Sequence, residues 1–234
     1  MAVLSLGLFG SVAKAYGAAR ALRNASLVLC LASGTALADP EPVTILALGD
    51  SLTQGYGLPE HEGFVPQLAA WLLAAGEQVS LINGGVSGDT TQGGLSRIEW
   101  SLAPGVDGVI VALGGNDVLR GISPEVSRAN LTGILDVTTA AGLPVLLVGI
   151  EAPGNFGPAY KEAFDAIYPE LSQEYEALLY PSFFAVFAGE GDVPAELGEM
   201  VQADGIHPSA RGVAEIVADM GPAVQDLITL IRAR

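Results

Sequence analysis

The feature that most constrains the fold of this chain is an alternation of short apolar runs with longer segments of helical periodicity. The runs are rich in Val, Ile and Leu and are apolar on both faces, as strands of a buried parallel sheet are. We expect about five strands, at 43–48, 79–83, 106–113, 145–149 and 183–187. Strands and helices in this alternation predict an α/β domain of three layers, αβα, around a doubly wound parallel sheet.

The helices are expected at 64–75, 90–100, 123–141, 158–178 and 209–232. Ser123-Pro124 reads as an N-cap followed by a first-turn proline, and Gly142 is a typical helix stop. We expect Pro169 to perturb the fourth of these helices, and Gly221-Pro222 to kink or divide the last.

The first 38 residues differ from the rest of the chain. They contain three basic residues and no acidic residue, and an apolar stretch ends in Ala36-Leu37-Ala38. These features are typical of a secretory signal peptide, with cleavage after Ala38 and a single domain at 39–234. A membrane anchor or a core helix is the alternative, but the stretch is shorter than the roughly 20 residues that span a bilayer.

Cysteine usage and charge limit the partners. Cys30 lies inside the leader, so the mature chain would have no disulfide, thiolate nucleophile or cysteine metal site. Leu29 stands where a lipoprotein anchor needs a small residue, so we expect no stable membrane anchor after cleavage and a periplasmic or secreted protein. The formal charge of −16 repels polyanions, argues against nucleic acid as a partner and favours neutral substrates.

Four polar clusters follow strand positions, and they contain the candidate chemistry. They are Gly49-Asp50-Ser51-Leu52, residues 84–90, residues 114–117 and residues 204–207. In a doubly wound sheet the ligand crevice lies beyond the carboxyl ends of the strands. We therefore expect the four clusters to meet at one edge.

A hydroxyl needs a base to act as a nucleophile at neutral pH. Of the two histidines, His61 lies in a polar loop and reads as a surface residue, whereas His207 follows Asp204 by three positions. Asp204 is close enough to bond Nδ1 of His207 and leave Nε2 facing Ser51. The alternative is that Asp204 only caps a turn. Asp50 reads as a backbone-turn residue.

Acyl transfer also needs fixed donors for a negatively charged oxygen. The candidates are the backbone N–H groups of Ser51 and Gly88 and the side-chain amide of Asn116. Each of the last two could instead serve a turn, and turns are the expected role of the neighbouring glycines at 84, 85, 114 and 115. The chain has no phosphate loop, no dinucleotide fingerprint and no G-x-S-x-G elbow.

In order along the chain, Gly49-Asp50-Ser51-Leu52, Gly88, Gly114-Gly115-Asn116-Asp117 and Asp204-x-x-His207 resemble the four blocks of the SGNH (GDSL) hydrolase family. The resemblance covers about 43–232 and is strongest to bacterial periplasmic members with thioesterase, lysophospholipase and arylesterase activity. It implies a flavodoxin-like fold, Ser51 as nucleophile, His207 as base oriented by Asp204, and an oxyanion hole of Ser51, Gly88 and Asn116. It implies no metal and no cofactor.

The resemblance also places the acyl groove beside the loop 151–157. Candidate substrate-binding residues are Leu119, Ala152, Gly154, Asn155 and Phe156. Glu151 and Ala152 stand where relatives often carry a basic and a bulky apolar residue. No role is assigned to residues 188–200.

The expected function is therefore a secreted serine hydrolase of carboxylic ester or thioester bonds in small acyl substrates. A sugar O-acetyl esterase or acyltransferase with the same triad remains open. A non-catalytic lipid- or glycan-binding module is a further alternative, and a metal-dependent phosphohydrolase built on the many aspartates is a remote one.

Overall fold

The computed structural model describes residues 42–187 and 197–234. The predicted leader and most of the unassigned segment 188–200 therefore lie outside the described residues. In the described part, five parallel strands form one sheet in the order β2-β1-β3-β4-β5. They are β1 (Val43–Gly49), β2 (Val79–Gly85), β3 (Gly108–Ala112), β4 (Val145–Val148) and β5 (Leu178–Tyr180).

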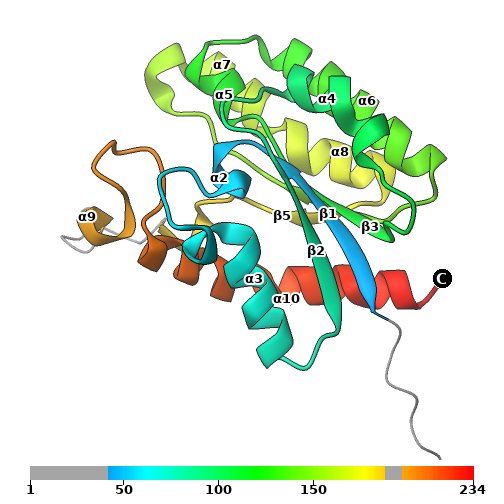
Figure 1. The fold of residues 1–234 in the computed structure, drawn as a ribbon. Coiled ribbons are helices and arrows are strands. Elements are labelled where there is room, and N and C mark those ends of the chain that lie inside the picture. The colour runs from blue at the N-terminus through cyan, green and yellow to red at the C-terminus, as the bar shows by residue number, and fades with distance from the viewer. Residues whose placement is uncertain (1–41, 188–196) are drawn as a thin grey trace, which may run out of the picture. The chain divides into compact units, whose positions relative to one another are not determined.

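Helices cover both faces of this sheet, as Figure 1 shows. On one face α3 packs against α10, and on the other α4 packs against α6 and α6 against α8. The predicted three-layer αβα fold is thus confirmed. The helices are α2 (Ser51–Gln54), α3 (Phe64–Ala74), α4 (Thr91–Ser101), α5 (Gly115–Leu119), α6 (Pro124–Ala140), α7 (Pro158–Asp165), α8 (Ile167–Tyr175), α9 (Leu197–Met200) and α10 (Ala210–Arg232), with short 3₁₀ helices at Glu60–Glu62, Gly154–Phe156 and Ala185–Phe187.

The register of the central strands decides where the polar clusters lie. Strand β1 lies between β2 and β3, and Gly49 at its carboxyl end is aligned with Gly85 and Ala112. The side chains of β3 and β4 are all buried, as expected for strands covered on both faces. The segments that leave β1, β2 and β3 therefore start side by side at one edge of the sheet.

The predicted fifth strand at 183–187 is wrong. The fifth strand is β5, earlier in the chain, and the aromatic run after Pro181 folds as turns and a 3₁₀ helix. Phe183 donates its N–H to Gly149 O at 2.8 Å and packs its ring against Phe64 in the core. The run is apolar because Phe183 fills the core, and not because it pairs along a strand.

Two helices also differ from expectation. The predicted helix 158–178 is two helices, α7 and α8, divided at Ala166. Pro169 lies in the first turn of α8, where its missing N–H costs no helical hydrogen bond. By contrast, Pro222 lies inside α10 without dividing it. A Cβ on Gly221 would come within 2.5 Å of the Trp71 ring, so this glycine permits close packing on α3.

Within residues 42–187 and 197–234, no helix combines the length and the apolarity that a membrane span requires.

Candidate functional site

Ser51 is the first residue of α2, directly beyond the carboxyl end of β1. Asp50 is the N-cap of this short helix, and its Oδ1 accepts a hydrogen bond from Leu52 N–H at 3.0 Å. A carboxylate is a favourable N-cap because it accepts a backbone N–H that has no partner within the helix. The strand-to-helix turn thus places Ser51, a residue that is 8 % exposed, at the sheet edge.

A chain of hydrogen bonds joins Ser51, His207 and Asp204. The Ser51 Oγ lies 2.9 Å from Nε2 of His207, and Nδ1 of His207 lies 2.7 Å from Oδ2 of Asp204. A carboxylate can only accept, so Nδ1 carries the proton and Nε2 is left as an acceptor for the Ser51 hydroxyl. In this geometry Nε2 can accept the proton of that hydroxyl, which is what a general base requires.

Asp204 also stabilises the loop that contains it. Its Oδ1 accepts the backbone N–H groups of His207 at 3.0 Å and Ile206 at 2.9 Å. The pKa of Asp204 is lowered to about 2, mainly by the hydrogen bond from the His207 backbone N–H. The hydrogen bond from the His207 ring and the one from the Ile206 N–H lower it further. Turn capping and orientation of the imidazole are therefore done by the same carboxylate, one with each oxygen.

The other two candidate donors lie beside Ser51. Gly88 and Asn116 both line the cavity that contains Ser51 and His207. Gly88 has φ of +82°, a conformation that other residues adopt only with strain. The turn role expected for Gly84 and Gly85 is wrong, because both lie in β2, and a Cβ on Gly85 would come within 2.2 Å of Gln54 N. Gly85 thus allows the turn carrying Ser51 to approach β2.

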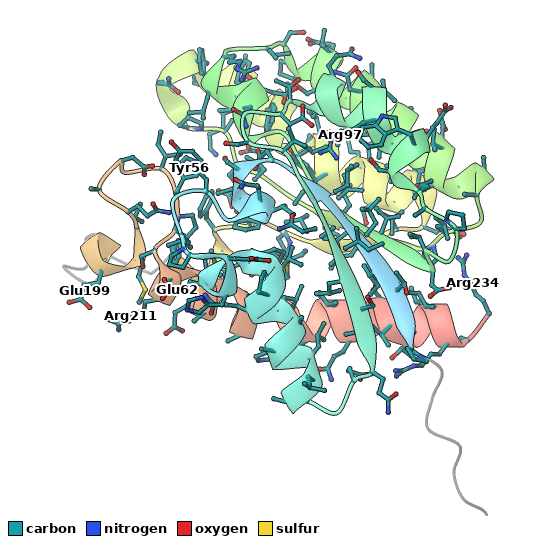
Figure 2. The ribbon with its side chains drawn as sticks, in the orientation of Figure 1. Tyr56, Glu62, Arg97, Glu199, Arg211 and Arg234 are labelled. Atoms are coloured by element: carbon teal, nitrogen blue, oxygen red, sulfur yellow. The ribbon has the colours of Figure 1, made fainter. Side chains whose placement is uncertain are left out.

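Two arginines hold the loop that contains Gly88. Arg97 of α4 is 8 % exposed; its Nη2 donates to Gly49 O at 2.8 Å and its Nε to Asp89 Oδ2 at 2.7 Å. Arg97 therefore joins the end of β1 to the residue after Gly88, and Figure 2 shows it on the α4 side of the sheet. Arg120 donates from Nη2 to Gly88 O at 2.7 Å. Sequence reasoning gave neither arginine a role.

A buried carboxylate ties the start of α4 to α5. Asp117, which is fully buried, accepts the backbone N–H of Thr91 at 2.9 Å, the Thr91 hydroxyl at 2.5 Å and the Ser127 hydroxyl at 3.0 Å. Because Asp117 follows Asn116 and Thr91 follows the Gly88 loop, this network fixes the two loops relative to each other. Buried networks with every member satisfied have this rigidifying effect.

The cavity has a volume of about 410 Å³ and an apolar wall. The wall includes residues from four separate parts of the chain: Leu52, Val118, Leu119, Ile150, Pro153 and Phe184. Its ionisable lining groups are Asp50, Tyr56, Glu151, Asp204 and His207. A cavity of this kind suits an uncharged acyl chain with a polar group at one end.

The predicted substrate-binding residues are not all in this wall. Leu119 lines the cavity and is 61 % exposed. Ala152 is buried behind the wall, where its N–H donates to Asp165 Oδ1 at 2.8 Å and its carbonyl accepts from Lys161 Nζ at 2.8 Å. Gly154, Asn155 and Phe156 form the 3₁₀ helix beyond Pro153 and do not line the cavity. Their contact with a substrate stays a prediction.

Sequence reasoning missed two aromatic residues of the cavity. Tyr56, in the segment after α2 (Figure 2), lines it and is half-exposed. Phe184 lines it as well, and the prediction of a strand at 183–187 concealed that turn. Neither residue belongs to a recognisable motif, so no sequence signal pointed to it. His61, predicted to be a surface residue, has a side chain that is 82 % exposed.

Within residues 42–187 and 197–234, no group of three or more His, Cys, Asp or Glu side chains has the arrangement to hold a metal ion.

Comparison with known proteins gives consistent matches. Residues 47–214 match the GDSL-like lipase/acylhydrolase family. The esterase TesA of Pseudomonas aeruginosa is 36 % identical over 188 residues, which are 79 % of this chain and 89 % of that protein. The thioesterase 1/protease 1/lysophospholipase L1 of Escherichia coli is 37 % identical over 191 residues, covering 79 % of this chain and 85 % of that protein. The crystal structure of AlinE4, an SGNH-hydrolase family esterase, is 43 % identical with a TM-score of 0.65, over 80 % of this chain and 96 % of that one.

Proposed function

The chain belongs to the GDSL-like lipase/acylhydrolase family of ester hydrolases, and from this premise we propose that it is a secreted serine esterase and thioesterase. Its substrates would be small acyl esters and thioesters, cleaved by Ser51, His207 and Asp204. The observation that carries the proposal is the pair of hydrogen bonds from Ser51 Oγ to His207 Nε2 and from His207 Nδ1 to Asp204.

The reaction would proceed in two halves. Ser51 Oγ attacks the acyl carbon while His207 Nε2 takes its proton, and the carbonyl oxygen becomes an oxyanion. The C–O or C–S bond then breaks, and the leaving alcohol or thiol takes the proton from His207. Water attacks the acyl-enzyme by the same route, with His207 as base, and releases the carboxylic acid and free Ser51. Asp204 stabilises the imidazolium in both halves.

The oxyanion would be held by the backbone N–H groups of Ser51 and Gly88 and by Nδ2 of Asn116. The positive φ of Gly88 and the hydrogen bonds made by Arg97 and Arg120 support a fixed position for the second donor. Fixed donors matter because they need no reorganisation when charge develops.

The lining of the cavity supports uncharged substrates. Its apolar wall can take an acyl chain, whereas Glu151 and the net charge of −16 repel anionic groups. Carboxylic esters with neutral leaving groups are therefore the preferred class over highly anionic thioesters.

Substitution of Ser51 tests the chemistry. Ser51→Ala should lower turnover of p-nitrophenyl butyrate by about 10⁴-fold or more. Ser96→Ala, which removes an exposed hydroxyl on α4, is the matched control and should leave turnover unchanged. A fluorophosphonate should label the wild type and Ser96→Ala but not Ser51→Ala. An unlabelled wild type would favour a binding module, and an active Ser51→Ala would exclude this nucleophile.

Export is tested separately. When the full chain is produced in a bacterium, the periplasmic fraction should contain a protein whose first residue is Asp39. Recovery of the chain from the cytoplasm with its first 38 residues attached would contradict secretion.

A further inference from the structure

Asp50 is a buried carboxylate next to the nucleophile that the proposed reaction does not use. It is 2 % exposed, and burial raises its pKa to about 6 against the opposing effect of its hydrogen bonds. Its Oδ1 caps α2 through Leu52 N–H. Its Oδ2 accepts a hydrogen bond from Nδ2 of Asn116 at 3.2 Å. The two oxygens therefore have different partners.

Helix capping alone does not explain why the residue at position 50 is an aspartate. Serine, threonine and asparagine cap helices about as well and bring no charge into the interior. A negative charge beside the site of a developing oxyanion is also unfavourable by itself. What only a carboxylate offers is a pair of oxygens that accept and never donate.

That property decides how the amide of Asn116 is turned. Rotation of this amide by 180° exchanges Nδ2 for Oδ1, and the two orientations occupy the same space. Beside the acceptor Oδ2 of Asp50, only the orientation with Nδ2 toward Asp50 makes a hydrogen bond. Nδ2 carries two hydrogens, so one goes to Asp50 and the other is available to the cavity that Asn116 lines.

We propose that Asp50 is a positioning residue that holds the Asn116 amide with Nδ2 toward the substrate oxygen. It acts through Asn116 and does not touch the reacting atoms. The inference rests on the proposed function, because it requires Asn116 to donate to the oxyanion. It couples the nucleophile and the oxyanion donor through one side chain, since Asp50 also caps the helix that begins with Ser51.

Asp50→Asn is the informative substitution. The new Oδ1 can still cap Leu52 N–H, but the new Nδ2 is a donor facing the donor of Asn116. The Asn116 amide then turns over to satisfy it and presents a lone pair to the cavity. With p-nitrophenyl butyrate, kcat should fall by about 10²-fold, the cost of one lost oxyanion donor, while KM changes by less than about threefold.

A double-mutant cycle separates this route from a structural one. Asn116→Ala should lower kcat by about 10²-fold. If Asp50 acts through Asn116, adding Asp50→Asn to that variant should lower kcat by less than about threefold further. Losses that multiply would overturn the inference, because Asp50 would then act elsewhere, for example on Ser51 through its helix.

Controls keep the result interpretable. Asp107→Asn removes another carboxylate that accepts a backbone N–H, from Thr44 at the opposite end of the sheet, and should leave kcat unchanged. Urea midpoints of all variants verify folding. An unchanged kcat in Asn116→Ala would overturn both this inference and the proposed oxyanion hole. A large loss in Asn116→Ala with multiplying losses would overturn the inference alone.

Discussion

The ring of Tyr56 lies against the imidazole of His207, with ring centroids 4.6 Å apart and planes inclined at 36°. Hydrogen bonds from one side chain link the two loops that contain these rings. Gln202 Nε2 donates to Tyr56 O at 2.8 Å and to Pro208 O at 2.9 Å. The imidazole is thus held on one face by an aromatic ring and at Nδ1 by a carboxylate, which leaves Nε2 directed at Ser51.

Removal of the Tyr56 ring should loosen the base. Tyr56→Ala is expected to lower kcat for p-nitrophenyl butyrate by up to about tenfold, because aromatic packing contributes about 1 kcal/mol. Tyr56→Phe keeps the ring and should stay within about twofold of the wild type. Equal losses in the two variants would mean that the hydroxyl, and not ring packing, is what matters.

Asp204→Asn should lower kcat by about 10³–10⁴-fold, because an amide no longer selects the imidazole tautomer with an acceptor at Nε2. Asp204→Asn should also lower the stability of the protein at neutral pH, and this difference from the wild type should disappear in acid. The pKa of Asp204 is depressed, so the stabilisation is present above the unfolded pKa of 3.8 and is lost as pH falls toward about 2. Acid unfolding of the two proteins, followed by circular dichroism, measures this; a wild type no more acid-sensitive than the variant contradicts it.

Asp50 should make the protein less stable as pH rises. Its pKa is about 6 in the folded protein and 3.8 as the ordinary value, so the folded state binds the extra proton between these values. The contribution of Asp50 to stability is therefore greatest below about pH 4 and falls as pH rises through 6, by up to about 3 kcal/mol. In urea titrations, the free energy of unfolding of Asp50→Asn minus that of the wild type should grow over this range. A constant difference would refute the shifted pKa.

Arg97 should be costly to remove. Arg97→Met leaves Asp89 without its cation and Gly49 O without a donor, and we expect the free energy of unfolding to fall by about 3–5 kcal/mol. The double variant Arg97→Met/Asp89→Asn should recover part of the loss, since no charge is left unpaired. Urea denaturation measures both. Failure of the second substitution to restore any stability would show that the charge pair is unimportant.

Glu151 should govern discrimination by charge. Glu151→Gln is expected to raise kcat/KM for an anionic acyl-CoA, relative to a neutral p-nitrophenyl ester of equal acyl length, by about two- to fivefold. The gain should shrink in high salt, because salt screens exposed charges. Glu99→Gln, an exposed position on α4, is the control for net charge. An equal gain in that control would assign the effect to the whole molecule.

The three-layer arrangement of helices and sheet could be predicted because apolar runs and helical periodicity depend only on residues that are close together in the chain. The aromatic run at 183–187 was not, because burial in a turn and burial in a strand demand the same residue types. Pro222 was also misinterpreted, because the rule applied to it considers only the local sequence. Its local rule predicts a break, yet Gly221 lets α10 pack closely on Trp71, and the helix continues through it.

The positions of Ser51, Gly88 and Asn116 around one cavity followed from the predicted parallel sheet, since each lies in a polar cluster beyond a strand. His207 lines the same cavity, but it follows α9 and not a strand. The groups that hold them did not follow. Arg97 and Gln202 act through carbonyl oxygens of residues distant in sequence, and any residue offers a carbonyl. Hydrogen bonds of this kind therefore produce no recognisable sequence motif. Asp50 and Asn116 were each visible in a motif, but the hydrogen bond between them was not predicted.

The segment after β4 supplies Ile150, Glu151 and Pro153 to the cavity, whereas the proposed nucleophile follows β1, with β3 between the two strands. This part of the cavity wall is thus anchored on a different strand from the proposed nucleophile. Chain-length preference and bond-breaking chemistry can accordingly change independently. Grafting this one loop from a relative is the economical route to a new selectivity.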